Sequence, residues 1–194
     1  MSLSFASLRR WSLLALLAFG LTPVAAFAQQ PAATQSETGA PLVTRNQLRL
    51  NFAGAETVLR AAKAKAEEMK LTVNIAVVDD GGHLLAFARM DGARPASAYT
   101  AITKATASAT LRAPTRPAPF GSPTPDVLLS LSLQNAAAAS GGKFTALYGG
   151  VPIVVEGQVI GAVGVGGATG EQDAEIGGAG VAALVEALAK QAGK

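Results

Sequence analysis

Residues 149–165 read GGVPIVVEGQVIGAVGV, and residues 75–93 read IAVVDDGGHLLAFARMDGA, which contains the only histidine of the chain. Each stretch has two apolar runs, rich in β-branched residues, on either side of a short turn sequence. Glu156-Gly157 and Asp80-Gly81-Gly82 are turn residues typical of β-hairpins. Because such short turns join antiparallel strands, we expect two antiparallel hairpins.

The segments around these hairpins have the apolar spacing of helices. Apolar residues recur at three and four positions along residues 45–70, and residues 171–190 begin with acidic side chains and carry Lys190 near the end. The expected helices are 45–70, 96–113, 126–134 and 171–190, and the expected strands are 73–79, 83–90, 144–148, 152–155 and 158–165. Residues 136–142 are small and are predicted to be mobile. The sequence therefore predicts an α+β domain with a single antiparallel sheet of about five strands and flanking helices.

The first 28 residues have the pattern of an export signal peptide. Arg9 and Arg10 form a basic start, residues 11–21 are apolar, and Ala26-Phe27-Ala28 matches a small-x-small cleavage site. Residues 29–43 are rich in Ala, Pro, Thr and Gln and are predicted to be a flexible leader. We expect one domain over residues 44–194, no membrane span in the mature chain, and a periplasmic or secreted protein.

Composition excludes several kinds of site. The chain has no cysteine and one histidine, so disulfides, thiolate metal sites, iron–sulfur clusters, covalent c-type haem and a zinc site of several histidines in one chain are excluded. The net charge is +3, of which Arg9 and Arg10 supply two charges, and no dense basic cluster points to nucleic acid. Weak charge and an apolar fraction of 49% suit a protein that associates with itself.

His83 is the first candidate for a functional side chain. It lies where a turn meets a strand, and its imidazole could be an axial haem ligand, a base, a metal ligand or only a hydrogen-bonded turn residue. Strand alternation places Leu85, Phe87 and Arg89 on the same face as His83. An arginine on that face could pair with a haem propionate, and Met90 or a hydroxyl could ligate iron more weakly.

Other candidates lie in the helices and loops. The helix start at Glu171 could hold a carboxylate, although Glu171 and Asp173 could instead cap it. Residues 161–170 are rich in glycine but do not match a nucleotide-binding loop. A polar stripe with Lys104 beside it could line a pocket or a subunit interface, or could be a solvated face; it consists of Tyr99, Thr103, Thr106 and Thr110.

Several spaced motifs occur in one order along the chain: AVVDDGGHL at 76–84, ARMDGA at 88–93, Lys104-Ala105, Pro114-Thr115, GGVP at 149–152, GAVGV at 161–165 and EQD at 171–173. At these residues, over about 48–188, the chain resembles the haem-binding GlcG/HbpS-like family, a domain formerly of unknown function that has been labelled haem-degrading. The resemblance implies a profilin-like or PAS-like fold, even-numbered homo-oligomers, haem as a cofactor and a sensor protein as a partner. It also implies a haem-contacting threonine within 104–115. A Glu-x-x-Glu iron motif is not present.

We therefore expect an exported, oligomeric haem-binding protein. His83 is the expected iron ligand, basic side chains would meet the propionates, and Met90 and Thr115 would complete the pocket; the basic candidates are Arg89, Arg94 and Lys104. One alternative is a periplasmic binding protein or enzyme for a small carboxylate such as a 2-hydroxy acid, and another is a structural oligomer without a ligand. No catalytic residue follows from the sequence, and haem degradation is implied by the resemblance alone.

Overall fold

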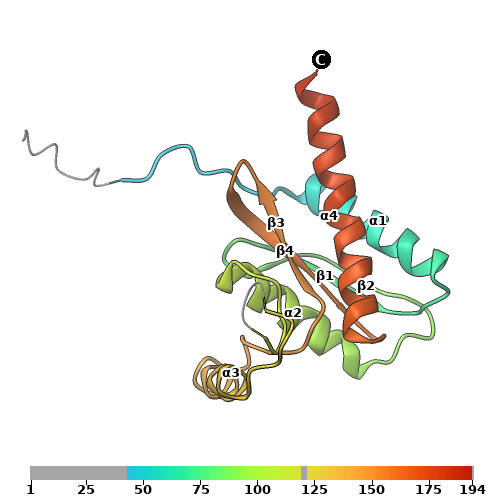
Figure 1. The fold of residues 1–194 in the computed structure, drawn as a ribbon. Coiled ribbons are helices and arrows are strands. Elements are labelled where there is room, and N and C mark those ends of the chain that lie inside the picture. Colours follow the sequence, from blue (N-terminus) through green and yellow to red (C-terminus); the bar gives the residue numbers. More distant parts are fainter. Residues whose placement is uncertain (1–42, 119–121, 194) are drawn as a thin grey trace, which may run out of the picture. The chain divides into compact units, whose positions relative to one another are not determined.

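The computed structural model describes residues 43–118 and 122–193. The predicted signal peptide and, apart from Val43, the predicted leader lie outside the described residues. The elements are α1 (Phe52–Glu68), β1 (Asn74–Asp79), β2 (Leu84–Arg89), α2 (Ala96–Leu111), α3 (Val127–Ala139), β3 (Gly150–Val155), β4 (Gln158–Gly166) and α4 (Gly170–Ala192), as Figure 1 shows. None of the helices in this described part is long and apolar enough to cross a membrane.

Both predicted hairpins are present, and together they form one antiparallel sheet. The strand order is β2-β1-β4-β3, so β1 and β4 are central and join the two hairpins. Ile75 lies opposite Val165 in this central pair. Glu156 and Gly157 have φ angles of 49° and 75°, and a two-residue turn with positive φ at both positions matches the twist of the strands that it connects.

The sheet has four strands among the described residues, where about five were predicted. The predicted strand at 144–148 is not a strand; the Leu147 backbone N–H donates instead to the Thr145 side chain over 3.1 Å, and the segment lines a cavity. Its aromatic and aliphatic residues suit a cavity wall as well as a strand, so the sequence alone could not separate the two.

Two helix boundaries differ from the prediction by several residues. α1 begins at Phe52 and not at residue 45, because the Asn51 side chain accepts a hydrogen bond from the Gly54 N–H over 2.8 Å and caps the helix there. α3 continues to Ala139, through residues predicted to be mobile, because alanine is the best helix former.

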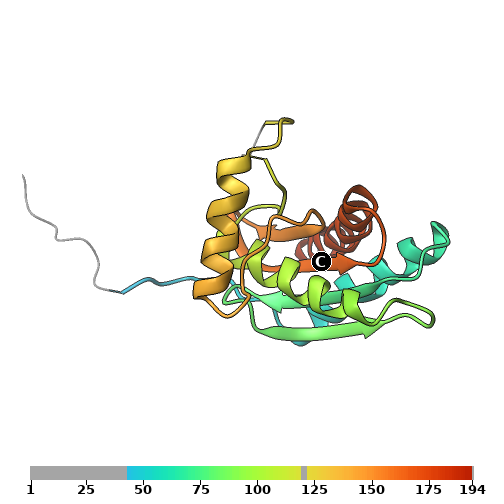
Figure 2. The same cartoon turned by 90° about the horizontal axis from the view of Figure 1, so that it is seen from below.

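The two faces of the sheet are covered differently. α1 and α4 pack on one face, where bulky residues such as Val58, Ile75 and Ile176 form the main core. α2 packs on the other face, as Figure 2 shows, through small residues such as Ala101 and Ala105. The small residues bring α2 close to the sheet, which fixes the position of the polar side chains along this helix.

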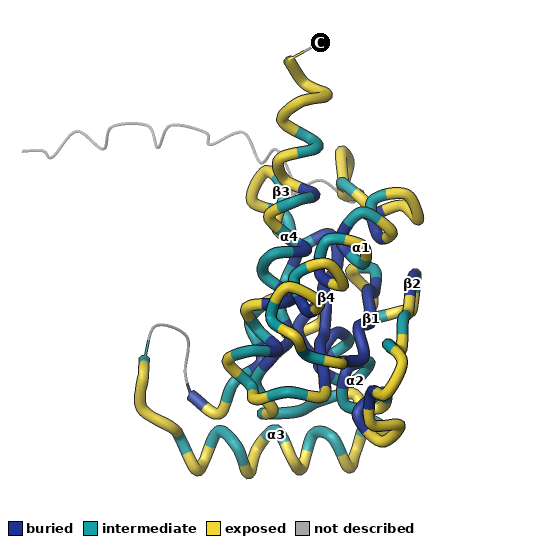
Figure 3. The backbone as a smooth tube through the Cα atoms, turned by 90° about the vertical axis from the view of Figure 1, so that its right-hand side faces the viewer, coloured by how far each residue is buried: buried dark blue, intermediate teal, exposed yellow. Residues whose placement is uncertain are grey.

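α3 is placed apart from these layers. In Figure 3 its tube alternates between intermediate and exposed, whereas β1 and β4 are buried. It has no buried residue and packs extensively against no other helix or strand of the described part of the chain. α3 therefore contributes little to the core, and it forms part of the wall of a cavity.

Candidate functional site

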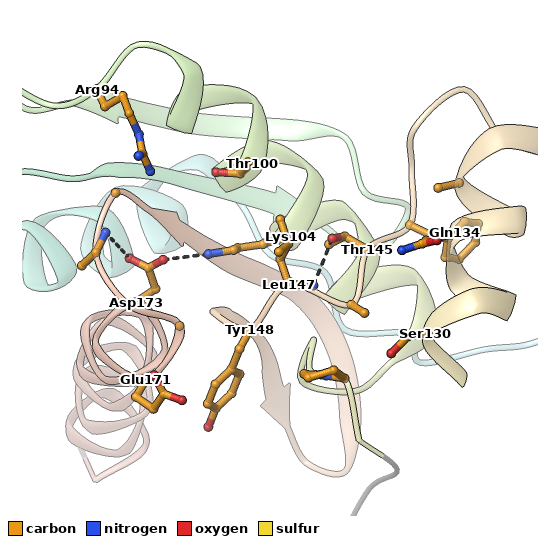
Figure 4. Close-up of a pocket in the computed structure, with 17 residues that line it drawn as sticks. Arg94, Thr100, Lys104, Ser130, Gln134, Thr145, Leu147, Tyr148, Glu171 and Asp173 are labelled. Atoms are coloured by element: carbon orange, nitrogen blue, oxygen red, sulfur yellow. Dashed lines mark hydrogen bonds and ion pairs between the residues drawn. The ribbon is translucent and has the colours of Figure 1, made fainter. Parts of the chain in front are cut away.

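A cavity of about 680 Å³ lies between α2, α3, the segment 144–148 and the start of α4. Figure 4 shows its lining, with Thr100 and Lys104 from α2 and Gln134 from α3. Apolar side chains from the segment 144–148 and from nearby loops form much of the remaining wall, namely Pro117, Phe144, Ala146, Leu147 and Ala168. The cavity therefore combines an apolar wall with polar and charged side chains, among them the carboxylates of Glu171 and Asp173.

A buried ion pair forms the floor of this cavity. Lys104 Nζ lies 2.7 Å from Asp173 Oδ2 and donates to the Val165 carbonyl over 2.8 Å. Asp173 Oδ1 accepts the Ala168 N–H over 3.2 Å. Burial raises the pKa of the Asp173 carboxyl above its ordinary value, and the nearby Lys104 opposes this rise without cancelling it. Lys104 already donates to the Asp173 carboxylate and to the Val165 carbonyl. We therefore assign the Lys104–Asp173 pair a structural role, which is to hold α2 against α4.

The start of α4 is closed by a capping box. Thr169 Oγ1 accepts the Gln172 N–H over 3.3 Å, and Gln172 Oε1 accepts the Thr169 N–H over 3.1 Å. The prediction of a capped helix end is confirmed, but the capping residues are Thr169 and Gln172 and not Glu171 and Asp173. The helix start therefore offers fewer open N–H groups to a carboxylate ligand than the sequence suggested.

Arg94 is the cation available to a ligand. Its Nε donates to Ser97 Oγ over 2.9 Å, and Figure 4 shows the side chain directed toward the space above the Lys104–Asp173 pair. Its two terminal guanidinium nitrogens have no hydrogen-bond partner among the described residues. An arginine held through Nε in this way has its remaining donors oriented for a carboxylate.

Tyr148 is a lining residue that the sequence reasoning missed as a functional group. It is half-buried and lies against the first residue of α4, because a Cβ on Gly170 would be only 2.7 Å from the Tyr148 Cβ. The signal in the sequence was its position directly before Gly149-Gly150. The pairing of Lys104 with Asp173, 69 residues away, had no local signal.

The predicted site residues are only partly brought together. Arg94 and Lys104 line the cavity, but the other four do not. Arg89 is exposed on the edge strand β2, and Met90 packs against the main core. Thr115 is buried, accepts the Gly150 N–H over 2.8 Å and lines a second cavity of about 330 Å³.

His83 lies in the turn between β1 and β2, outside the cavity. Its side chain is 82% exposed, and Nδ1 lies 3.2 Å from Asp79 Oδ1. Partial burial of the Asp79 carboxyl would raise its pKa, but hydrogen bonds from the His83 backbone and side chain outweigh this and lower the pKa below its usual value. The geometry is that of a hydrogen-bonded turn, and the role of His83 as an iron ligand stays a prediction.

The polar stripe of α2 is partly structural. Thr106 donates to the Gly82 carbonyl over 3.1 Å and Thr110 donates to the Thr106 carbonyl over 2.8 Å, whereas Tyr99 is exposed. The described residues contain no cluster of three or more His, Cys, Asp or Glu side chains that could hold a metal ion.

Comparison with known proteins connects this fold to one family. The family model described as "Haem degrading protein HbpS-like" matches residues 50–182. Protein GlcG of Escherichia coli K12 is 39% identical over 111 residues, which are 57% of this chain and 76% of GlcG.

Two solved structures extend the comparison to the fold. A double mutant of Streptomyces reticuli HbpS has a TM-score of 0.59 and 31% identity, over 75% of this chain and 97% of HbpS. A complex of PduOC with heme has a TM-score of 0.58 and 23% identity, over 70% of this chain and 95% of PduOC, and shows the similarity of fold alone.

Proposed function

The chain belongs to the HbpS-like family, and from this premise we propose that it binds haem in the cavity between α2, α3 and the start of α4. The family description names haem. PduOC, a protein of the same fold, has been crystallised as a heme complex. Both observations support a haem-related function for this chain, and the geometry of the cavity supports the location.

The cavity has the chemistry that haem needs. Haem is a flat apolar ring with two carboxylates, so its site needs an apolar wall and at least one cation. The volume of about 680 Å³ falls in the ordinary range for small-molecule sites. The observation that carries the proposal is Arg94, whose terminal nitrogens are open above an apolar-walled space of this size. We assign one propionate to Arg94.

Tyr148 is the candidate for the iron ligand inside the cavity. Tyrosine is an established ligand of haem iron, and Tyr148 is the only tyrosine or histidine among the described residues that line this cavity. When bound, haem would supply an iron centre, which the Tyr148 hydroxyl would ligate. His83 remains the second candidate, from outside the cavity, and would require the haem to bind at the β1–β2 turn.

The proposal also includes export of the protein and its assembly into a homo-oligomer. The signal-like residues 1–28 support export to the periplasm or the medium. The resemblance and the weak net charge support an even-numbered homo-oligomer, and a haem-dependent role in sensing would need a separate sensor protein as partner. A small carboxylate such as a 2-hydroxy acid is the alternative ligand. Arg94 could bind its carboxylate, but the capping box at the start of α4 leaves fewer N–H groups free to bind it. A structural oligomer without a ligand is the second alternative, in which water would solvate the terminal nitrogens of the exposed Arg94.

Hemin titration of the pure protein tests the proposal. We expect a Soret shift that saturates near one haem per chain or per dimer. Arg94→Met should weaken binding by about tenfold or more, because a hydrogen bond to a charged group contributes about 1.5–3 kcal/mol. Arg89→Met is the matched control, since Arg89 lies on β2 outside the cavity, and it should bind as the wild type does.

Three outcomes decide between the candidates. If the spectrum stays that of free hemin while glycolate or lactate gives a saturable calorimetric signal, the carboxylate alternative replaces haem. If Tyr148→Phe changes the position of the Soret band and His83→Ala does not, Tyr148 is the ligand. The reverse result assigns iron to His83 and moves the site to the β1–β2 turn.

A further inference from the structure

Arg94 is anchored through both its backbone and its side chain, although it is an exposed residue. Its carbonyl accepts the Ser97 N–H over 3.0 Å and an Asn74 Nδ2–H over 3.1 Å, and its Nε donates to Ser97 Oγ over 2.9 Å. Asn74 and Ser97 are 0% and 2% exposed. Two buried polar residues therefore hold the backbone and the Nε of one solvent-accessible cation.

Asn74 is an unfavourable residue for its place in the sheet. It is the first residue of β1, paired with both β2 and β4, and asparagine is depleted in strands. Its Nδ2 donates to the carbonyls of Arg94 and Gly166, over 3.1 and 3.4 Å. Since both partners are acceptors, the amide nitrogen and not the oxygen must face them. The Asn74 Oδ1 is then left buried without a hydrogen-bond partner among the described residues.

The unpaired Oδ1 distinguishes Asn74 from an ordinary core residue. An apolar side chain at this position would avoid the free-energy cost of a lone buried acceptor. The benefit of the asparagine lies instead in its two donors, and the shorter bond goes to the Arg94 carbonyl. Asn74 therefore ties the loop that carries Arg94 to the end of the central strands.

Ser97 is fixed against the same end of the sheet. It is the second residue of α2, and its carbonyl accepts the Thr100 hydroxyl over 3.0 Å. A Cβ on Gly166 would lie 2.7 Å from the Ser97 carbonyl oxygen, so the glycine lets this turn of α2 approach β4. The start of α2 thus holds Ser97 in place, and its hydroxyl reaches the Arg94 Nε from a fixed position.

The cavity also contains carboxylates that compete for Arg94. Glu171 and Asp173 both line it, and Figure 4 shows Arg94 directed toward the space above the Lys104–Asp173 pair. Burial raises the pKa of the Asp173 carboxyl, and the charges of Lys104 and Arg94 lower it, so the guanidinium lies within electrostatic reach of this carboxylate. An arginine free to rotate would gain by pairing with either carboxylate, and its charge would then be neutralised before a ligand arrives.

The contact with Ser97 also selects how a ligand can bind Arg94. A guanidinium presents its N–H donors in a planar fork, and here Ser97 takes the donor on Nε. The terminal nitrogens then form the open end of the fork, where parallel donors match the oxygens of one carboxylate. Serine is a neutral acceptor, so Arg94 keeps its full charge for that carboxylate.

We propose that Asn74 and Ser97 are positioning residues for ligand binding, which hold Arg94 open toward the cavity and away from Glu171 and Asp173. The inference rests on the proposed role of Arg94 as the residue that binds a ligand carboxylate. It adds that this role depends on two buried side chains that do not line the cavity themselves.

Ser97→Ala tests the side-chain contact by hemin titration. It should weaken hemin binding by about threefold to tenfold, because Arg94 loses the hydrogen bond that holds its Nε. The Soret band of the saturated complex should keep its position, since no iron ligand is changed. Ser108→Ala is the matched control and should bind hemin as the wild type does, because Ser108 is also a buried serine of α2 and its hydroxyl donates to the Ala113 carbonyl instead.

A double-mutant cycle tests whether the effect passes through Arg94. In an Arg94→Met background, Ser97→Ala should cause no further loss of hemin affinity. Asn74→Leu, which removes the donors to the Arg94 carbonyl, should likewise weaken binding in the wild type and not in the Arg94→Met background. A general loosening of the site would instead weaken binding by the same factor in both backgrounds.

Exchange of the Arg94 Nε–H with water, measured by NMR, tests the contact without a ligand. In the wild type it should be slower than for Arg89, which is exposed on β2. Ser97→Ala should raise the Arg94 rate to that of Arg89, and Ser108→Ala should leave it unchanged.

The proposal is refuted by an unchanged hemin affinity of Ser97→Ala, by an equal loss of affinity in the Arg94→Met background, or by an Arg94 Nε–H that exchanges as fast as that of Arg89 in the wild type. A wild type that does not bind hemin refutes the proposed function instead. In that case the exchange rates still decide whether Ser97 holds Arg94, and glycolate replaces hemin in the titrations.

Discussion

At the scale of single residues, the Lys104–Asp173 pair has the clearest energetic consequence. Lys104→Met leaves the Asp173 carboxyl buried without its cation, and breaking a buried pair in this way costs about 3–5 kcal/mol. We expect urea unfolding to show a loss of this size. Adding Asp173→Asn should recover much of it, because the amide keeps an acceptor for the Ala168 N–H without a buried charge. Equal stability of the single and double variants would contradict this account.

Asp79 gives a prediction about pH. Its pKa in the folded protein lies below the ordinary value of 3.8, so the unfolded chain binds the proton more readily. The stabilisation by this group is complete above the ordinary value and is lost as the pH falls through the folded pKa. We expect the unfolding free energy of Asp79→Asn to fall less steeply with acidification than that of the wild type, measured by urea unfolding at a series of pH values. Identical slopes would rule this out.

At the scale of elements, the approach of α2 to β4 depends on Gly164. A Cβ at this position would lie 2.1 Å from the Ala101 carbonyl oxygen and 2.4 Å from the Ala105 nitrogen. Backbone atoms cannot yield by that amount without moving the helix, so Gly164→Ala should destabilise the protein by about 3 kcal/mol or more. Thermal unfolding measures the loss.

Gly178 provides the control for that substitution. It lies in α4 with no atom near the position of a Cβ, so Gly178→Ala should stabilise the protein by about 0.5–1 kcal/mol. If both alanine variants have the same melting temperature, the close contact between α2 and β4 does not require glycine at position 164.

The elements also show how far the sequence could predict the fold. Hairpins at 75–93 and 149–165 were predictable, because turn residues and apolar runs are local signals. The segment 144–148 was not, since whether apolar residues pair as a strand or line a cavity depends on distant neighbours. The start of α1 was missed because one side chain, Asn51, fixes it.

At the scale of the whole molecule, the candidate site was only partly predictable. Lys104 was expected to meet a propionate as part of a family motif and Arg94 as a nearby basic residue, and both line the cavity. Tyr148 and the partner of Lys104 were not found, because α2, the segment 144–148 and α4 meet only in the folded chain. His83 was selected for the chemistry of its imidazole, and the type of a residue does not predict where its side chain lies in the folded protein.

The central claim is that haem occupies the cavity between α2, α3 and the start of α4. A crystal structure of the hemin complex of the wild-type protein measures this directly. We expect haem against the apolar wall formed by Phe144 and Leu147, with a propionate on Arg94 and iron bound by Tyr148. A haem bound at the β1–β2 turn through His83, with the cavity filled only by water, would contradict it.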